Sequence, residues 1–257
     1  MKTIEFNIEN GIAKIVLQRP EVYNSVNKEM ALAIQKALDE SKAEEVRVVL
    51  ITGTGKAFCA GQDLQEVVDP NGPPLKSIVS DHYNPIILKI NELNKPVVAA
   101  VNGVAAGAGA NIALNCDIVF AKKSASFLQA FSKIGLIPDS GGTHILPRLV
   151  GMQKAAGLMM FAEKISAEDA EKMGMIYKVF EDEDFEKEVE SHVNFLANMP
   201  TSALAQTKKL LQLSIKNDLK TQLDLEGQYQ TLAGQSYDYS EGVQAFLEKR
   251  KPIFLGK

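Results

Sequence analysis

Short apolar runs along the first 180 residues predict a series of β-strands. Residues 2–8 and 11–17 alternate apolar and polar positions on either side of Glu9-Asn10-Gly11, which predicts a β-hairpin. Where the apolar run is short and continuous, we expect a buried strand. Such strands are predicted at Arg47–Thr52, Pro96–Asn102 and Asp117–Ala121, with further short strands at Ser126–Phe131 and Ile176–Phe180.

Helical periodicity fills most of the intervals between these strands. It predicts helices over Lys28–Ala43 and Asp81–Leu93, and a helix after the glycine-rich turn GVAAGAG. The segment Val68–Leu75 holds three prolines and Gly72, so we expect a mobile loop there. Because strand, glycine turn and helix recur at short spacing, the chain is predicted to have an α/β fold.

The periodicity becomes almost wholly helical after Gly151. From Pro200 onwards the helical pattern is polar, as in a tail that packs against another subunit. We therefore divide the 257 residues into a core over 1–199 and a C-terminal helical region over 200–257.

Composition narrows the range of functions. With 46% hydrophobic and 23% charged residues and a formal net charge of −4, the chain resembles an ordinary globular protein and lacks the basic excess of nucleic-acid binders. Its two cysteines, Cys59 and Cys116, lie in apolar or small-residue surroundings, which favours buried reduced thiols over a disulfide framework or a zinc site. The N-terminus does not read as a signal peptide, and no apolar run is long enough to cross a membrane. We expect a cytoplasmic enzyme that binds neither nucleic acid nor membrane.

Acidic residues are scarce in the middle of the chain. The 70 residues between Glu92 and Glu163 hold only Asp117 and Asp139, where the average composition would place about nine acids. A carboxylate in apolar, glycine-rich surroundings has its charged form desolvated, which raises its pKa and suits it to proton transfer near neutral pH.

Two small-residue segments suggest an oxyanion hole. The first is AFCAGQDL (Ala57–Leu64), and the second is VNGVAAGAGAN, which precedes a predicted helix. Small residues let a ligand carbonyl approach the main chain, and two N–H groups aimed at one oxygen stabilise an enolate-like anion. Tight helix–strand packing explains the same glycines equally well, so the residues leave both interpretations open. A dinucleotide site is disfavoured because the third glycine of G-x-G-x-x-G is missing.

At this point a family resemblance becomes specific. The strings AFCAGQDL, KPVVAAVNGVAAGAGANIALNCDIVFA and IGLIPDSGGTHILPRLVG, followed by ISAEDAEKMGMIYKVF and EGVQAFLEKRKPIF, are similar to the enoyl-CoA hydratase/isomerase (crotonase) superfamily over nearly the whole chain. The resemblance implies a ββα-spiral core with a C-terminal helical trimerisation region. It also implies acyl-CoA thioester substrates, no cofactor because CoA is part of the substrate, no metal, and a homotrimer or homohexamer.

The resemblance also assigns roles to residues. It places the oxyanion donors on the backbone N–H groups of Gln62 and Ala108, and it places the two catalytic glutamates of hydratases at Asn111 and Phe131. Since neither of these side chains is a general base, hydration by the usual mechanism is not expected. Asp139, in IPDSGGT, is then the expected catalytic residue.

The same resemblance suggests contacts to the rest of the substrate. Tyr83, Asn111, Leu128 and Phe131 are expected to line the acyl pocket, although core packing is the ordinary role of such side chains. CoA is expected to lie against Ala60, Asp63 and Leu64, and Lys249 is expected to meet its phosphates, from a neighbouring subunit or else as part of a solvated charge run.

The expected function is that of an acyl-CoA isomerase. The chain is most similar to the branch of the family that converts ring-1,2-epoxyphenylacetyl-CoA to oxepin-CoA and shifts 3-enoyl-CoA to 2-enoyl-CoA. The alternatives are a hydratase-like enzyme or an isomerase of fatty-acid oxidation, a distant aryl-CoA dehalogenase, and a non-catalytic acyl-CoA-binding paralogue. Asp139 also suits a helix N-cap, and Asp117 is interpreted as structural.

Overall fold

The hairpin and the buried strands form one six-stranded sheet in the computed structural model, which describes residues 2–257. Its order is β1-β2-β3-β5-β7-β10, and β1 and β2 pair antiparallel whereas the other neighbours pair parallel. The strands are β1 (Ile4–Glu9), β2 (Ile12–Leu17), β3 (Val48–Gly53), β5 (Val97–Val101), β7 (Ile118–Lys122) and β10 (Lys178–Phe180). The predicted hairpin and buried strands are confirmed, with ends that differ by one or two residues.

A second, smaller sheet was not predicted. It has the order β4-β6-β8-β9 and consists of β4 (Ala57–Cys59), β6 (Val104–Ala106), β8 (Ser126–Leu128) and β9 (Ile165–Ser166). The prediction of a turn over GVAA is therefore wrong at β6, and the strand predicted over Ser126–Phe131 ends at Leu128, where a 3₁₀ helix, η3 (Ala130–Ile134), takes over. Strands of two or three residues are too short to show a periodicity of their own.

From β3 to β8, consecutive strands alternate between the two sheets. β3 lies in the large sheet and β4 in the small one, and β5/β6 and β7/β8 repeat the arrangement, each pair being followed by a helical segment. This repetition of two strands and a helix confirms the α/β, spiral-core expectation.

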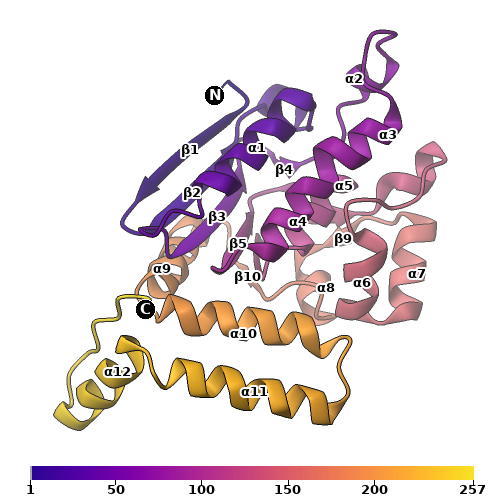
Figure 1. Ribbon diagram of the computed structural model, residues 1–257. Helices are drawn as coiled ribbons and strands as arrows, with labels where there is room; N and C mark the ends of the chain where they lie inside the picture. The colour runs from indigo at the N-terminus through magenta and orange to yellow at the C-terminus, as the bar shows by residue number, and fades with distance from the viewer. Residues whose placement is uncertain (1) are drawn as a thin grey trace.

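The helices cover both faces of the large sheet (Figure 1). α1 (Lys28–Glu40) begins where the Asn27 side chain accepts a hydrogen bond from the N–H of Met30, and it ends three residues before the predicted Ala43. The helix predicted over Asp81–Leu93 is α4 (Asn84–Glu92), preceded by a π-helical segment, η2 (Ile78–Tyr83). The predicted loop holds the end of α2 (Leu64–Val68) and the start of α3 (Leu75–Ser77).

The remaining helices follow in chain order: α5 (Ala108–Leu114), α6 (Gly142–Val150), α7 (Met152–Phe161), α8 (Ala167–Lys172), α9 (Phe185–Ala197), α10 (Thr201–Ser214), α11 (Leu219–Ala233) and α12 (Tyr237–Glu248). Among residues 2–257, no helix combines the length and apolar character needed to cross a bilayer.

The hydrophobic core lies on both faces of the large sheet. Val49 and Ile51 of β3 belong to the main cluster, which includes α1, α4 and α5, whereas Val48 and Leu50 belong to a second cluster with α9. Because successive strand residues face opposite sides, a continuous apolar run fits a strand covered on both faces.

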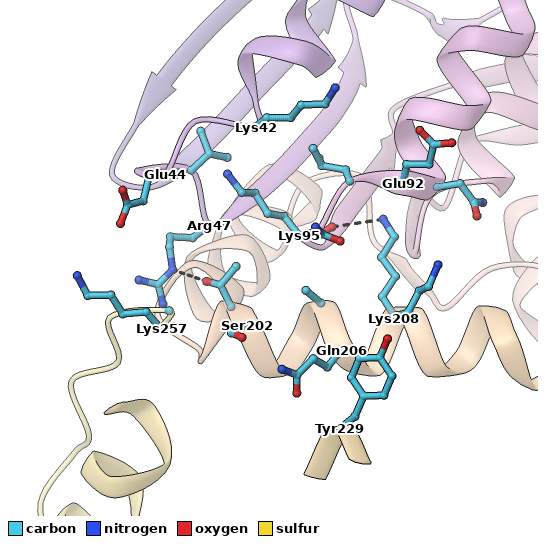
Figure 2. Close-up of a pocket in the computed structure, with 18 of the residues that line it drawn as sticks. Lys42, Glu44, Arg47, Glu92, Lys95, Ser202, Gln206, Lys208, Tyr229 and Lys257 are labelled. Carbon is cyan, nitrogen blue, oxygen red and sulfur yellow. Dashed lines mark hydrogen bonds between the residues drawn. The ribbon is translucent and has the colours of Figure 1, made fainter. Parts of the chain in front are cut away.

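The C-terminal helices begin at Thr201, next to the predicted division at residue 200, and α10 and α11 lie side by side below the core (Figure 1). Lys208 of α10 reaches into the core, where its Nζ donates to Asp117 Oδ2 at 2.8 Å and to the Ile90 carbonyl at 2.7 Å. Figure 2 shows Arg47, Lys95 and Lys208 around a cavity of about 630 Å³ at this junction. All three cations already donate to main-chain carbonyls, so they hold the junction together.

Candidate active site

The candidate site lies where the parallel strands of the small sheet end. β4 and β6 pair parallel, as do β6 and β8, so their carboxyl ends meet at one edge. Gln62 follows β4, Ala108 follows β6, and Gln129 follows β8 directly. Residues distant in sequence are thus brought to one edge.

Gln62 and Ala108 both present main-chain N–H groups that local structure leaves available. Val26 forms a parallel bridge beside Gln62, donating to the Gly61 carbonyl at 2.7 Å and accepting from Asp63 N at 3.0 Å. The Gln62 N–H therefore points away from Val26. Ala108 is the first residue of α5, where an N–H has no acceptor within its own helix.

Gly61 sets the spacing between these two segments. Its φ is +94°, and a Cβ built on it would lie 3.0 Å from the Ala106 carbonyl oxygen and 3.4 Å from Ala108 N. The chain beside Gln62 therefore packs directly against the chain that carries Ala108, at a distance that a side chain would disturb.

Asp139 lies in the loop between η3 and α6 and is partly buried. Desolvation raises the pKa of its carboxyl group, and this is opposed by the Ser140 hydroxyl, which donates to Asp139 Oδ1 at 2.9 Å. The N-cap of α6 is Gly141, and no side chain caps that helix. The interpretation of Asp139 as a helix cap is therefore wrong.

Neither position that the resemblance assigns to a hydratase glutamate offers a carboxylate. Asn111, on α5, is completely buried, and its amide is engaged with Gln129 and with the Asp139 carbonyl. Phe131, on η3, is 6% exposed, and its ring lies beside Gly107, next to Ala108. Asn111 thus faces the loop that carries Asp139.

Gln129 is a site residue that sequence reasoning missed. Its side chain is 3% exposed and donates from Nε2 to Asn111 Oδ1 at 2.8 Å. The signal that could have identified it is a single amide within the apolar string SFLQAF. A polar side chain in such a run either faces solvent or forms hydrogen bonds in the interior.

Two other expected pocket residues also lie near this edge. Tyr83, the last residue of η2, is fully buried, and its hydroxyl has no hydrogen-bond partner among residues 2–257. Burial raises the pKa of Tyr83, and the neighbouring Cys59 and Asp139 raise it further. Leu128 ends β8 and accepts a hydrogen bond from Gly107 N at 2.8 Å.

The expected CoA contacts divide into two groups. Ala60, Asp63 and Leu64 flank Gln62: Asp63 caps α2 and pairs with Arg19 at 2.8 Å, and Leu64 is 54% exposed. Lys249 follows α12, on the far side of the chain from α2 (Figure 1). Within one subunit, Lys249 therefore does not lie beside Ala60, Asp63 and Leu64.

Cys59 and Cys116 are buried free thiols, as predicted. Asp117 accepts from Val97 N at 2.8 Å as well as from Lys208, contacts that agree with the structural interpretation. Within residues 2–257, no group of three His, Cys, Asp or Glu side chains is arranged to hold a metal ion.

Comparisons with known proteins cover the whole chain. A family model described as enoyl-CoA hydratase/isomerase matches residues 7–257. The Escherichia coli K12 protein named 1,2-epoxyphenylacetyl-CoA isomerase is 47% identical over 100% of both chains. The Rhodobacter capsulatus protein named "Probable enoyl-CoA hydratase" is also 47% identical, over 99% of this chain and 98% of its own. A crystal structure of enoyl-CoA hydratase from Bacillus anthracis matches with a TM-score of 0.92 and 32% identity, over 99% of this chain and 100% of that one.

The family match, the full-length relatives and the shared architecture agree with one another. The chain belongs to the enoyl-CoA hydratase/isomerase family.

Proposed function

We propose that this protein is an acyl-CoA isomerase that uses Asp139 as its proton carrier. The observation that carries the proposal is a partly buried carboxylate with a raised pKa, on a loop whose main chain is held by Asn111 of α5, the helix that begins at Ala108. A carboxyl group whose pKa is raised exchanges protons more readily near neutral pH.

The proposed reaction moves one proton within the substrate. The Gln62 and Ala108 N–H groups hold the thioester oxygen, which stabilises the enolate formed when Asp139 removes a proton from C2. In a 3-enoyl thioester the electrons of the C2–H bond form the new C2=C3 bond, and those of the C3=C4 bond take the proton back from Asp139 at C4. No net electrons and no water are required.

The side chains at the hydratase positions favour isomerisation over hydration. Adding water across a double bond needs a group that positions and deprotonates the water, and Asn111 and Phe131 supply none. Of the two relatives at 47% identity, one is named a hydratase and the other an isomerase, so their names do not decide between the two reactions. The side chains at positions 111 and 131 of this chain support isomerisation.

For the acyl group, we propose ring-1,2-epoxyphenylacetyl-CoA, converted to oxepin-CoA, beside aliphatic 3-enoyl-CoA. The name of the Escherichia coli relative supports the aromatic substrate. The same enolate chemistry serves both, since each substrate loses a C2 proton and regains it at another carbon. In the aromatic substrate the carbon–carbon bond shared by the epoxide and the six-membered ring also opens, and its electrons enter the double bonds of the seven-membered oxepin.

The test compares the wild type with Asp139→Asn on both substrates. The amide keeps the shape of the carboxylate but cannot accept a proton, so we expect turnover to fall by about 10²–10⁴-fold, the usual contribution of general acid–base catalysis. Hydration of 2-enoyl-CoA is the control reaction and is expected to be undetectable. Near-full isomerase turnover in Asp139→Asn would refute the assignment, and efficient hydration would favour the hydratase alternative.

We further propose a homotrimer or homohexamer in which the C-terminal helices pack between subunits. α11 buries none of its side chains in the single chain, and large apolar side chains remain exposed there and beyond, among them Leu219, Leu223, Leu232, Phe246, Leu247 and Ile253. A neighbouring subunit would also supply Lys249 to the CoA phosphates. A monomer in light scattering would contradict this proposal.

A further inference from the structure

Three buried amide side chains are linked to the main chain of Asp139 and Ser140, Asn111 and Asn115 directly and Gln129 through Asn111. Asn111, Asn115 and Gln129 are 0%, 8% and 3% exposed. Asn111 Nδ2 donates to the Asp139 carbonyl at 2.9 Å, and its Oδ1 accepts from Gln129 Nε2 at 2.8 Å. Asn115 Nδ2 donates to the Ser140 carbonyl at 3.1 Å and to the Asn111 carbonyl at 2.8 Å.

These bonds fall on a strained turn. Ser140 has a φ of +50°, which a residue with a side chain rarely adopts, and a Cβ on Gly142 would lie 2.4 Å from Asn111 Nδ2. The Asp139 carbonyl also accepts from Gly142 N at 2.8 Å. With two donors on one carbonyl oxygen, the peptide plane after Asp139 is fixed, and this sets the direction in which the Asp139 side chain leaves the main chain.

An amide meets both hydrogen-bonding demands at position 111, whereas an ionised carboxylate does not. The group must donate to the Asp139 carbonyl and accept from Gln129, and an ionised carboxylate only accepts. The Asn111 amide therefore makes hydrogen bonds that an ionised glutamate at this position could not make.

We propose that Asn111 and Gln129 are positioning residues, which form an amide relay that holds the Asp139 main chain and thereby aims its carboxylate. The inference rests on the proposed function of Asp139. Neither amide takes or gives a proton in the reaction. Asn111 acts on the carbonyl of residue 139, and Gln129 acts on Asn111.

The relay matters most for the second half of the reaction. Asp139 takes a proton from C2 and must then deliver it to a different carbon of the same bound thioester. A carboxylate released from its fixed direction still takes the C2 proton, but it loses that proton to solvent before delivery. The fraction of abstracted protons delivered to C4 therefore reports on the direction of the Asp139 carboxylate. This fraction does not depend on how much of the protein is folded.

The experiment follows 3-enoyl-CoA in D₂O and measures isomerised product and deuterium exchange at C2 of recovered substrate. The variant is Asn111→Asp, which keeps the shape and removes the donor when it is assayed at a pH where the new carboxyl group is ionised. The matched control is Asn102→Asp. Asn102 also ties main-chain segments together, donating to the Gly55 and Ala57 carbonyls at 3.1 and 3.2 Å, but it does so at the amino ends of β4 and β6.

For Asn111→Asp we expect kcat to fall by about 10–100-fold, as for a misplaced reacting group, with KM changed by less than about twofold. The ratio of product to exchange should fall several-fold relative to the wild type, whereas Asn102→Asp should keep the wild-type ratio. The double variant Asn111→Asp with Asp139→Asn should be no slower than Asp139→Asn alone, because the relay acts only through Asp139. If Asn111→Asp does not fold, Gln129→Leu carries the same test.

An unchanged product-to-exchange ratio, with activity that only tracks the folded fraction, would overturn the relay. That result is distinguishable from failure of the proposed function. If Asp139→Asn retains turnover, the proposed function fails. If Asp139→Asn is inactive but Asn111→Asp keeps the wild-type ratio of product to exchange, only the relay is overturned.

Discussion

Replacing Gly61 by alanine tests whether the close packing beside Gln62 and Ala108 builds an oxyanion hole. The new Cβ would stand 3.0 Å from the Ala106 carbonyl oxygen and 3.4 Å from Ala108 N. Both contacts involve main chain, which cannot rotate away as the end of a side chain can. The segment that carries Gln62 and the segment that carries Ala108 must therefore move apart.

Two effects are expected, and they differ in magnitude. A φ of +94° is unfavourable for alanine, by about 1–2 kcal/mol, which lowers the free energy of unfolding. A separation of about 0.4 Å between the two segments would lengthen an N–H···O bond from about 2.9 to about 3.3 Å, beyond its ordinary range. Since loss of one oxyanion donor reduces kcat by about 10²–10³-fold, weakening one should reduce it by about 10–100-fold.

Gly151 provides the matched control. Its φ is +78°, but a Cβ there would meet nothing within 4 Å. Gly151→Ala should therefore show a similar loss of stability in thermal unfolding while its kcat for 3-enoyl-CoA isomerisation stays near the wild-type value. Both variants are assayed at a temperature where each is fully folded.

The comparison refutes the reasoning if Gly61→Ala and Gly151→Ala lose stability equally and both retain wild-type kcat. In that case the segments beside Gly61 tolerate displacement, and the N–H groups of Gln62 and Ala108 do not hold a reacting oxygen.

Three further predictions concern proton affinity, stability and assembly. Ser140→Ala removes the hydroxyl that lowers the pKa of Asp139, so this pKa should rise further. Because only the ionised carboxylate accepts a proton, the acid limb of the pH profile of kcat/KM should move to higher pH. An acid limb that does not move would contradict this prediction. Lys208→Met breaks the ion pair with Asp117, which is 24% exposed, and should lower the free energy of unfolding in urea by about 2–3 kcal/mol, less than the 3–5 of a fully buried pair. Phe246→Glu, at a side chain that is 82% exposed, should weaken self-association in sedimentation while leaving the subunit folded, and an unchanged assembly would place this residue outside the interface.

Much of the large sheet was predictable because its signals are local. The alternation around Asn10 and the continuous apolar run that holds Val49 and Ile51 follow from which face of a strand each residue occupies. The three-residue strands β4 and β6 were missed, since they are held as strands by hydrogen bonds to parallel neighbours that come from distant parts of the chain.

The candidate site divides in the same way. The scarcity of acids pointed to Asp117 and Asp139, the family resemblance then favoured Asp139, and the small residues around Gln62 suggested available main-chain N–H groups. Whether Asp139 caps a helix depended on where α6 begins, and α6 begins after Gly141. The partnership of Asn111 with Gln129 needed the packing of α5 against the end of β8.

The sequence by itself determined which residues are able to do chemistry here, because charge, hydrogen-bonding capacity and small size belong to each residue type. It therefore singled out two carboxylates in an acid-poor region, of which the family resemblance favoured Asp139, and two segments of small residues. Only the tertiary structure decided which of these groups meet. The parallel order of β4, β6 and β8 brings their carboxyl ends to one edge, and the buried Asn111 and Asn115 donate hydrogen bonds to the Asp139 and Ser140 carbonyls of the loop.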